Sequence, residues 1–350
     1  MNQTASVPAS VTGLHLPQPY LLFLGDTTEP GYAKTAFGLR DWAPDRCVGE
    51  YVLPGGTVST GLPALGPAEA RARGARALLI GVANSGGAIP RSWWPALENA
   101  VDVGLNIISG MHSRLGDIPG LANRAARHGV QLIEVRDPPA DIPIGSGRKR
   151  SGKRLLTVGT DCALGKKYTA LTIARELAGR GVAADFRATG QTGIMIAGSG
   201  IPMDAVVADF AAGAAEMLSP DAPADHWDVI EGQGSLFHPA YSGVALALLH
   251  GSQPDVIILC HEPGRTAILG HPGYPLPQIE ETIALNLQLG ARTNAEIRCA
   301  GVSLNTARLS HDEAERLIAA ESDRLGLPVA DPIRGGQALT RMIDNILSAE

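Results

Sequence analysis

Residues 155–169 read LLTVGTDCALGKKYT, a short apolar run followed by a glycine-containing stretch with two adjacent lysines. Apolar residues then recur at helical spacing until Gly179 and Gly181, where a helix is expected to stop. Backbone N–H groups in such a turn converge on anionic oxygen atoms, and a lysine adds a point charge. The stretch therefore predicts a strand, a phosphate-binding loop and a helix. We expect ligand contacts from Gly159, Thr160, Asp161, Cys162, Gly165, Lys166, Lys167, Tyr168 and Thr169.

The spacing of this loop departs from the usual phosphate-loop pattern. Five residues separate Gly159 from Gly165, and Lys167 stands where a serine or threonine normally helps to hold magnesium. Thr169 comes two positions later. We therefore expect a phosphate-bearing ligand without a metal. A glycine-rich turn with solvated lysines is the alternative interpretation.

Composition sets the class of protein. The 350 residues are 45% hydrophobic and 18% charged, which favours two folded domains over a disordered chain. The net charge of −6 disfavours nonspecific nucleic-acid binding, and no apolar run is long enough to predict a membrane span. The first residues do not resemble a signal peptide. Four widely spaced cysteines are typical of reduced thiols, so we expect a cytoplasmic protein.

Apolar runs alternate with segments of helical spacing along most of the chain, which predicts α/β domains with parallel sheets. Residues 137–154, DPPADIPIGSGRKRSGKR, form the best candidate for a solvated linker. We therefore expect one domain over residues 1–145 and a second over residues 146–350. The expected strands include residues 20–24, 77–82, 105–108, 130–135, 155–158, 255–259 and 297–304.

The loop spacing resembles that of dethiobiotin synthetase and related P-loop ligases. In those enzymes the strand that reads the base often ends in Leu-Asn, and residues 301–306, GVSLNT, have that pattern. The resemblance implies that Asn305 binds an adenine edge. A polar residue that only caps a strand end explains Asn305 equally well.

Four further segments point to a narrower family. They are GQTGIMIAGSGIPMDAVVAD at 190–209, EGQGSLFHP at 231–239, LHGSQPD at 249–255 and CHEPGR at 260–265. Together with GTDCALGKK they resemble a P-loop family that includes D-glutamate N-acetyltransferases. The resemblance implies a Rossmann-like N-terminal domain, a P-loop NTPase-like C-terminal domain, and mainly parallel sheets in both. It also implies acetyl transfer from acetyl-CoA to the amine of a D-amino acid, with no metal required.

Acetyl transfer to an ammonium group needs a base. Glu231 is the first candidate because it follows an apolar run at an expected strand end, where α/β sheets bind ligands. A carboxylate that only bonds a neighbouring turn is the alternative. His238 is a candidate proton relay or a locally hydrogen-bonded loop residue. Asp204 is a further candidate base or the cap of the helix that follows it.

A dicarboxylate substrate favours guanidinium partners, and Arg187 and Arg265 lie near expected strand ends. Both also fit solvated surface arginines. The arginines of residues 148–154 are candidates for a CoA phosphate contact, although a solvated linker fits them better. Cys162 is compatible with an acetyl-cysteine intermediate or with simple loop packing.

Two other functions remain open from the residues alone. One is an ATP-dependent ligase or kinase related to dethiobiotin synthetase, and the other is a nucleotide-gated binding module without turnover. The oligomeric state is also open, and a homo-oligomer is compatible with the glycine- and alanine-rich helices.

Overall fold

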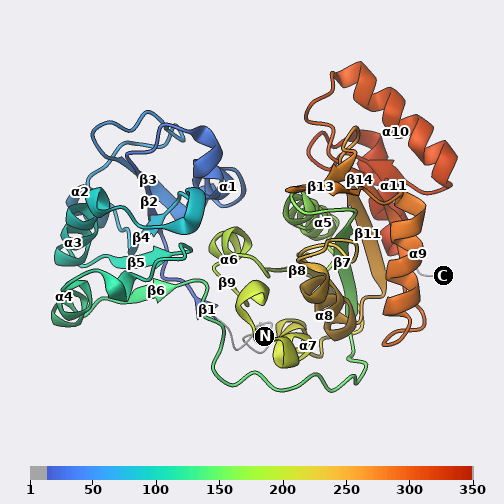
Figure 1. Cartoon of the computed structure of the whole chain (residues 1–350), viewed down its shortest axis with the longest axis horizontal. Helices are drawn as coiled ribbons and strands as arrows, with labels where there is room; N and C mark the ends of the chain where they lie inside the picture. Colours follow the sequence, from blue (N-terminus) through green and yellow to red (C-terminus); the bar gives the residue numbers. More distant parts are fainter. Residues whose placement is uncertain (1–13, 349–350) are drawn as a thin grey trace, which may run out of the picture. The chain divides into compact units, whose positions relative to one another are not determined.

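A computed structural model describes residues 14–348. The chain forms two compact units, shown in Figure 1. The N-terminal unit comprises the described residues up to Pro139 together with Gln191–Ala205, and the C-terminal unit comprises Ala140–Gly190 and the chain from Val206 onward. A single boundary near residue 145, as expected from the sequence, therefore assigns Gln191–Ala205 to the other unit. Residues 191–205 pack in the N-terminal unit, although they follow the first 51 residues of the C-terminal unit in sequence.

The N-terminal unit is built on a five-stranded parallel sheet with strand order β3-β2-β4-β5-β6. Its first strand, YLLFLG, is buried along its whole length, as expected for a parallel sheet covered on both faces. A short antiparallel pair, β1 with β9, ties the inserted segment to this unit. The elements are β1 Leu14–His15, β2 Tyr20–Gly25, α1 Lys34–Trp42, β3 Cys47–Val52, α2 Pro67–Ala72, β4 Ala77–Ile80, α3 Trp94–Asp102, β5 Asn106–Ser109, α4 Leu121–His128, β6 Leu132–Glu134, α6 Gln191–Ala197 and β9 Ser199–Gly200.

The C-terminal unit has a six-stranded parallel sheet with order β15-β14-β11-β7-β10-β8. Helices α5 and α11 contact one another and the sheet, while α7, α8 and α9 form a second contacting group. The elements are β7 Lys153–Gly159, α5 Lys166–Gly179, β8 Ala184–Arg187, α7 Ala208–Leu218, β10 Trp227–Ile230, α8 Ser242–Ser252, β11 Val256–His261, β12 Ala267–Ile268, β13 His271–Pro275, α9 Ile279–Gly290, β14 Arg298–Leu304, α10 His311–Leu325, β15 Val329–Ala330 and α11 Gly336–Leu347.

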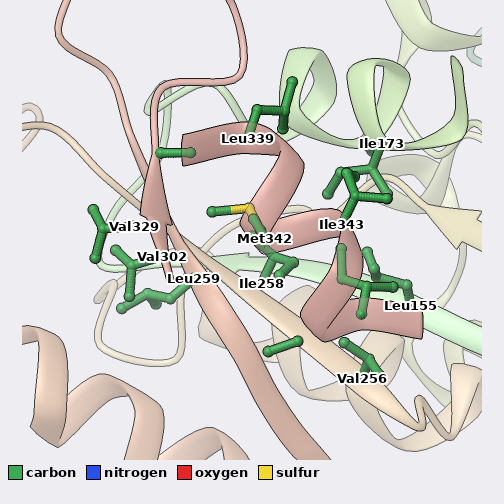
Figure 2. Close-up of a cluster of buried hydrophobic side chains, with 14 of the residues drawn as sticks. Leu155, Ile173, Val256, Ile258, Leu259, Val302, Val329, Leu339, Met342 and Ile343 are labelled. Atoms are coloured by element: carbon green, nitrogen blue, oxygen red, sulfur yellow. The ribbon is translucent and has the colours of Figure 1, made fainter. Parts of the chain in front are cut away.

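Strand β7 is an interior strand of the sheet in the C-terminal unit, and its apolar side chains belong to the hydrophobic core. In Figure 2, Leu155 from β7 and Ile173 from α5 lie close to Ile343 from α11, and Ile258 from β11 lies near Met342. All of these side chains are almost completely buried. Burial of this kind stabilises a fold by roughly 25 cal/mol per Å² of apolar surface. The packing fixes the position of the loop that follows β7.

The expected fold class is confirmed: both units are α/β, and both main sheets are parallel. The strands expected from apolar runs all form, with ends that differ by up to two residues. Strand β3 was not expected, because CVGEYV mixes polar and apolar residues. Within residues 14–348 no helix combines the length and apolarity that a membrane crossing requires.

The expected solvated linker is wrong for two of its three arginines, whereas the side chain of Arg148 is 64% exposed. Residues 140–152 contain no helix or strand, yet Arg150 and Arg154 are 6% and 0% exposed. Their guanidinium groups donate to backbone carbonyl oxygens, including Ser219 O for Arg150 and Pro220 O for Arg154. Arg150 lies before β7 and Arg154 near its start, so at least six residues of extended chain, roughly 20 Å, separate them from the loop that follows the strand. They are therefore structural and do not reach a phosphate held by that loop.

Candidate functional site

The glycine-containing loop forms the expected strand–loop–helix unit. Strand β7 ends at Gly159, residues 160–165 make the turn, and α5 begins at Lys166. Gly165 has a φ of +106°, which strongly favours glycine, and Ala163 adopts a φ of +56°. The first N–H groups of α5 lack partners from within the helix, and its dipole places positive potential at the same point. The local geometry fits an anion.

Lys166 lies at the base of this loop. The residue is 7% exposed, and its Nζ donates to the carbonyl oxygen of Asp161 at 2.7 Å. Burial lowers the pKa of Lys166 below its ordinary value, because the charged form is poorly solvated there. An anion at the loop would stabilise the charged ammonium. The Nζ of Lys167 lies 4.4 Å from the ring centre of Tyr168, a cation–π distance.

The Asp161 side chain organises the loop from within. Its residue is fully buried, and its carboxylate accepts from the N–H groups of Cys162 at 2.6 Å and Leu269 at 2.8 Å. Arg265 donates to the same carboxylate at 2.8 Å and to Cys162 O at 2.8 Å, and it also pairs with Glu262. Arg265 was expected to bind substrate. The structure instead places its guanidinium among protein partners that brace the loop.

Glu231 follows β10, the strand next to β7, and is 4% exposed. Its Oε2 accepts from the N–H groups of Thr189 at 3.0 Å and Gly190 at 3.1 Å. Burial raises the pKa of Glu231 above its ordinary value, and the positive charge of Lys167 is the first influence that opposes this rise. The carboxylate is thus held in place by two backbone N–H groups, and burial makes it more basic than an exposed glutamate.

Gly232 explains why the chain turns so closely at this point. A Cβ on Gly232 would lie 1.6 Å from the carbonyl oxygen of Thr157 in β7, so no other residue fits without a shift of the backbone. Its N–H donates to Thr157 Oγ1 at 2.9 Å. The EGQG stretch therefore packs directly against the strand that leads into the loop.

His238 is 2% exposed. Its Nδ1 accepts from the N–H of Ala240 at 3.1 Å, which assigns the proton of the neutral ring to Nε2. Nε2 lies 4.0 Å from an oxygen of Asp161. Burial lowers the pKa of His238, which favours the neutral ring. Nδ1 is therefore engaged by the Ala240 N–H, and Nε2 lies beyond hydrogen-bond distance from Asp161.

A cavity of about 280 Å³ opens beside the loop. Its lining is mainly apolar and includes Tyr168 and Ile333, with Asn305 at the end of β14. Asn305 Oδ1 accepts from the N–H of Ala307 at 3.2 Å, which supports the turn after the strand. Thr169 lines the same cavity, and its hydroxyl bonds Ser303 Oγ at 2.8 Å. That hydroxyl is therefore engaged within the fold and does not replace the one missing at position 167.

The remaining predicted residues lie elsewhere. Arg187, at the end of β8, donates through Nε to Asp228 at 2.6 Å and lies 3.2 Å from Asp185, so its charge is matched within the sheet. Asp204 belongs to the N-terminal unit, where Arg136 pairs with it at 2.7 Å. It precedes α7 by several residues and does not cap that helix.

Two side-chain groups among residues 14–348 bring three potential metal ligands together. One combines Asp161, Cys162 and His238, and the other combines Asp185, His226 and Asp228. In each group an arginine already pairs with a carboxylate: Arg265 in the first and Arg187 in the second. A cation placed there would be repelled by that arginine.

Two sets of groups were not predicted from the sequence. Asp331 and Arg334 shape the turn beside the cavity, and two backbone N–H groups hold Glu231. Asp331 accepts from the N–H of Thr306 at 3.0 Å, and Arg334 donates to the Thr306 carbonyl oxygen at 3.0 Å. The signal was present in the stretch DPIRGG at 331–336, which combines turn residues with two charges. The contacts of Thr189 and Gly190 with Glu231 are made by backbone N–H groups, which every residue except proline has, so the sequence could not indicate them.

Two family models match most of this chain. A P-loop domain described as a domain of unknown function, DUF1611_C, matches residues 143–340, and a Rossmann-like domain, DUF1611_N, matches residues 46–138. A solved structure of a DUF1611 family protein from Anabaena variabilis superposes with a TM-score of 0.83 and 33% sequence identity. That likeness covers 95% of this chain and 100% of the other.

Two curated proteins are similar over nearly their whole length. One, from Tritonibacter scottomollicae, is 50% identical over 326 residues, 93% of this chain and 97% of the relative. The other, from Pseudoalteromonas sp., is 45% identical over 323 residues, 92% of this chain and 97% of the relative. Both are named D-glutamate N-acetyltransferase. The chain therefore belongs to the DUF1611 family of P-loop proteins, the family of these D-glutamate N-acetyltransferases.

Proposed function

We propose that this protein transfers the acetyl group of acetyl-CoA to the amine of D-glutamate. The observation that carries the proposal is the 50% and 45% identity to D-glutamate N-acetyltransferases, which extends over both units. The site in the C-terminal unit supports it, because a loop suited to phosphate lies beside a cavity with an apolar lining. CoA combines phosphate groups, which suit the loop, with an adenine ring, which suits the apolar cavity.

The residues at the loop fit the anionic part of CoA. Lys166 and the first N–H groups of α5 would hold a phosphate group, and Tyr168, Asn305 and Ile333 would surround the adenine. The cavity volume of about 280 Å³ is near the lower end for ligand pockets, roughly 300–1,000 Å³. Position 167 holds lysine and the Thr169 hydroxyl bonds Ser303, which suits a phosphate held for binding rather than for hydrolysis.

Glu231 is the proposed base. It would take a proton from the substrate ammonium, and the free amine would attack the thioester carbon to form a tetrahedral intermediate. As the C–S bond breaks, the departing thiolate would take the proton held by Glu231, and the new amide nitrogen would lose its remaining extra proton to water. Burial raises the pKa of Glu231, which makes its carboxylate a stronger base than an exposed glutamate and so favours the first transfer. The N–H groups of Thr189 and Gly190 hold one carboxylate oxygen during the cycle.

The proposal is tested by mixing the purified chain with acetyl-CoA and D-glutamate and following free thiol with a thiol-reactive dye. We expect thiol release that depends on the amino acid and N-acetyl-D-glutamate as the product by mass spectrometry. A control without amino acid measures thioester hydrolysis. No turnover across a panel of D- and L-amino acids would contradict the proposal. Magnesium-dependent ADP formation from ATP would instead support a ligase or kinase.

We also propose that the protein works in the cytoplasm. All four cysteines are free thiols, and Cys260 is fully buried. Unpaired thiols suit a reducing compartment. Fractionation of the producing cells tests this assignment.

A further inference from the structure

Arg334 lines the cavity beside the loop, and the proposed function gives it no role. It belongs to the stretch DPIRGG at 331–336, which leads from β15 into α11. Arg150 and Arg154, which were candidates for a CoA phosphate contact, are structural and lie before or near the start of β7. CoA carries a 3′-phosphate besides the diphosphate proposed for the loop, and this third phosphate therefore still needs a partner.

Three hydrogen bonds hold the Arg334 guanidinium in one orientation. Nε donates to Thr306 Oγ1 at 2.7 Å, and Nη2 donates to the carbonyl oxygens of Thr306 at 3.0 Å and Leu309 at 2.6 Å. Among residues 14–348, none of the hydrogen bonds of this side chain uses Nη1. The side chain is 26% exposed, so a ligand can still reach it. A guanidinium that is already oriented loses little conformational freedom when it binds an anion.

The carboxylate that lies near Arg334, that of Asp331, is engaged mainly by other groups. It accepts from the N–H groups of Thr306 at 3.0 Å and Ile333 at 2.9 Å, and also from the Thr306 hydroxyl. Arg334 Nε lies 3.7 Å from this carboxylate, beyond hydrogen-bond distance. The positive charge of Arg334 is therefore only partly matched by Asp331.

The chemistry of CoA brings a phosphate to this part of the cavity. The ribose of CoA joins the adenine to the 5′-diphosphate and carries, on its 3′-oxygen, a phosphate that ATP and ADP lack. With the diphosphate on the loop and the adenine beside Tyr168 and Asn305, the ribose would lie in the cavity that Gly165 and Arg334 both line. A phosphate monoester carries nearly two negative charges at neutral pH and is a strong partner for arginine.

We propose that Arg334 binds the 3′-phosphate of CoA through Nη1 and so selects CoA over adenine nucleotides that have a 3′-hydroxyl. This inference rests on the proposed function, because it takes the ligand of the loop to be CoA. All of the residues that line this cavity belong to the C-terminal unit. The contacts of Nε and Nη2 stay in place when the phosphate binds, so the turn that they support keeps its shape.

The first test compares CoA with 3′-dephospho-CoA by calorimetry on the full-length wild-type chain. The two ligands differ only in the 3′-phosphate, so the ratio of their affinities isolates this contact. We expect CoA to bind about 10- to 100-fold more tightly, the range of one charge-assisted hydrogen bond. Equal affinities would overturn the inference.

The second test measures the same ratio in Arg334→Gln, which removes the charge. We expect the ratio to fall close to one, with the affinity for 3′-dephospho-CoA nearly unchanged. An arginine that only supports the fold would, when replaced, weaken both ligands by the same factor and keep their ratio, which would contradict the proposal.

Arg180→Gln is the matched control for this substitution. Arg180 follows α5 at the end opposite the loop, its side chain is 27% exposed, and it pairs with Asp344 at 2.6 Å. Its affinity ratio should equal that of the wild type. An equal fall of the ratio in Arg180→Gln and Arg334→Gln would show that the loss is not specific to the cavity and would overturn the assignment.

A conservative variant keeps the proposal testable if Arg334→Gln does not fold. Arg334→Lys keeps the positive charge and loses the planar set of donors, so it should prefer CoA by a smaller ratio than the wild type. An unchanged ratio would contradict the contact through Nη1.

The outcomes distinguish this inference from the proposed function. Wild-type protein that acetylates D-glutamate but binds CoA and 3′-dephospho-CoA equally would overturn the role of Arg334 and leave the acetyltransferase assignment intact. Wild-type protein that binds neither form of CoA and shows no turnover would overturn both.

Discussion

Two buried arginines lie near the start of strand β7 and two lysines follow its end, and the two pairs have different roles. Before and at its start, Arg150 and Arg154 are buried and hydrogen-bonded to backbone carbonyl oxygens. After its end, Lys166 and Lys167 open helix α5. Arg150 meets carbonyl oxygens near the C-termini of α7 and α8, such as Ser219 O and Gly251 O, where helix dipoles favour a cation.

The lysines lie at the N-terminus of a helix, where the electrostatic potential has the opposite sign. The N-terminus of α5 carries positive potential, so a buried lysine there is disfavoured until an anion arrives. In keeping with this, burial lowers the pKa of Lys166, whose Nζ donates to the carbonyl oxygen of Asp161 at 2.7 Å. Arginines satisfied by the protein indicate structure, whereas lysines at a helix N-terminus indicate a ligand. The comparison can be tested from either end of the strand.

The largest expected effect is on catalysis at the loop end. Glu231→Gln keeps the size of the side chain and removes its ability to take a proton. We expect kcat to fall by about 100- to 10,000-fold with CoA affinity nearly unchanged. Steady-state kinetics and calorimetry measure the two quantities. A variant that keeps kcat and loses CoA affinity would reassign Glu231 to support of the loop.

The pH profile gives an independent check on the same residue. A base must be deprotonated, so kcat/KM should fall as the pH is lowered through the pKa of Glu231. Because burial raises that pKa, the acidic limb should lie above the ordinary range of a glutamate. An acidic limb within the ordinary range, or one that persists in Glu231→Gln, would assign the titration to another group.

The next largest effect is on binding. Lys166→Met should weaken CoA affinity by about 10- to 100-fold, because a charge-assisted contact to phosphate is lost while the apolar stem is kept. The matched change on the other side of the strand is Arg154→Met, which should destabilise the fold without changing the CoA affinity of the folded protein. Calorimetry measures the CoA affinity of both variants, and equal affinities would contradict the proposed difference between the two ends of β7.

The third effect is on stability alone. Arg150→Met should lower the free energy of unfolding by about 3 kcal/mol, since several buried carbonyl oxygens lose their donor. Arg148→Met is its control: Arg148 pairs with Asp221 at 2.6 Å with a side chain 64% exposed, and its loss should leave the urea midpoint unchanged. Equal midpoints for the two variants would show that Arg150 is not structural.

Much of the fold could be predicted, because buried parallel strands appear as continuous apolar runs. YLLFLG and VIILCH are such runs, and both form strands. The inserted segment could not be placed, because apolar spacing shows that a residue is buried but not which core receives it. Arg150 and Arg154 were misjudged for a related reason: each donates to a carbonyl oxygen more than 60 residues away, Ser219 O and Pro220 O, and such backbone partners cannot be recognised from the side chains in the sequence.

The site was predictable where its chemistry depends on local spacing. The loop and the helix it opens are contiguous, and Glu231 directly follows an apolar run. Arg265 was harder, because its position near a strand end suits a substrate carboxylate and an internal one equally well. Only the tertiary structure shows that Asp161 takes up its charge.

The smallest expected effect is a proton-linked change in CoA affinity. In the free protein the pKa of Lys166 is lowered by burial, and a bound phosphate would raise it again by stabilising the charged form. Binding should therefore take up a proton at pH values between the two pKa values, and affinity should decrease as pH rises through that interval. Calorimetry in buffers of different ionisation enthalpy measures the uptake, with Lys166→Met as the control that should abolish it. Uptake that persists in Lys166→Met would assign the proton to another group, such as a phosphate of CoA itself, and would remove the contrast between the two ends of β7.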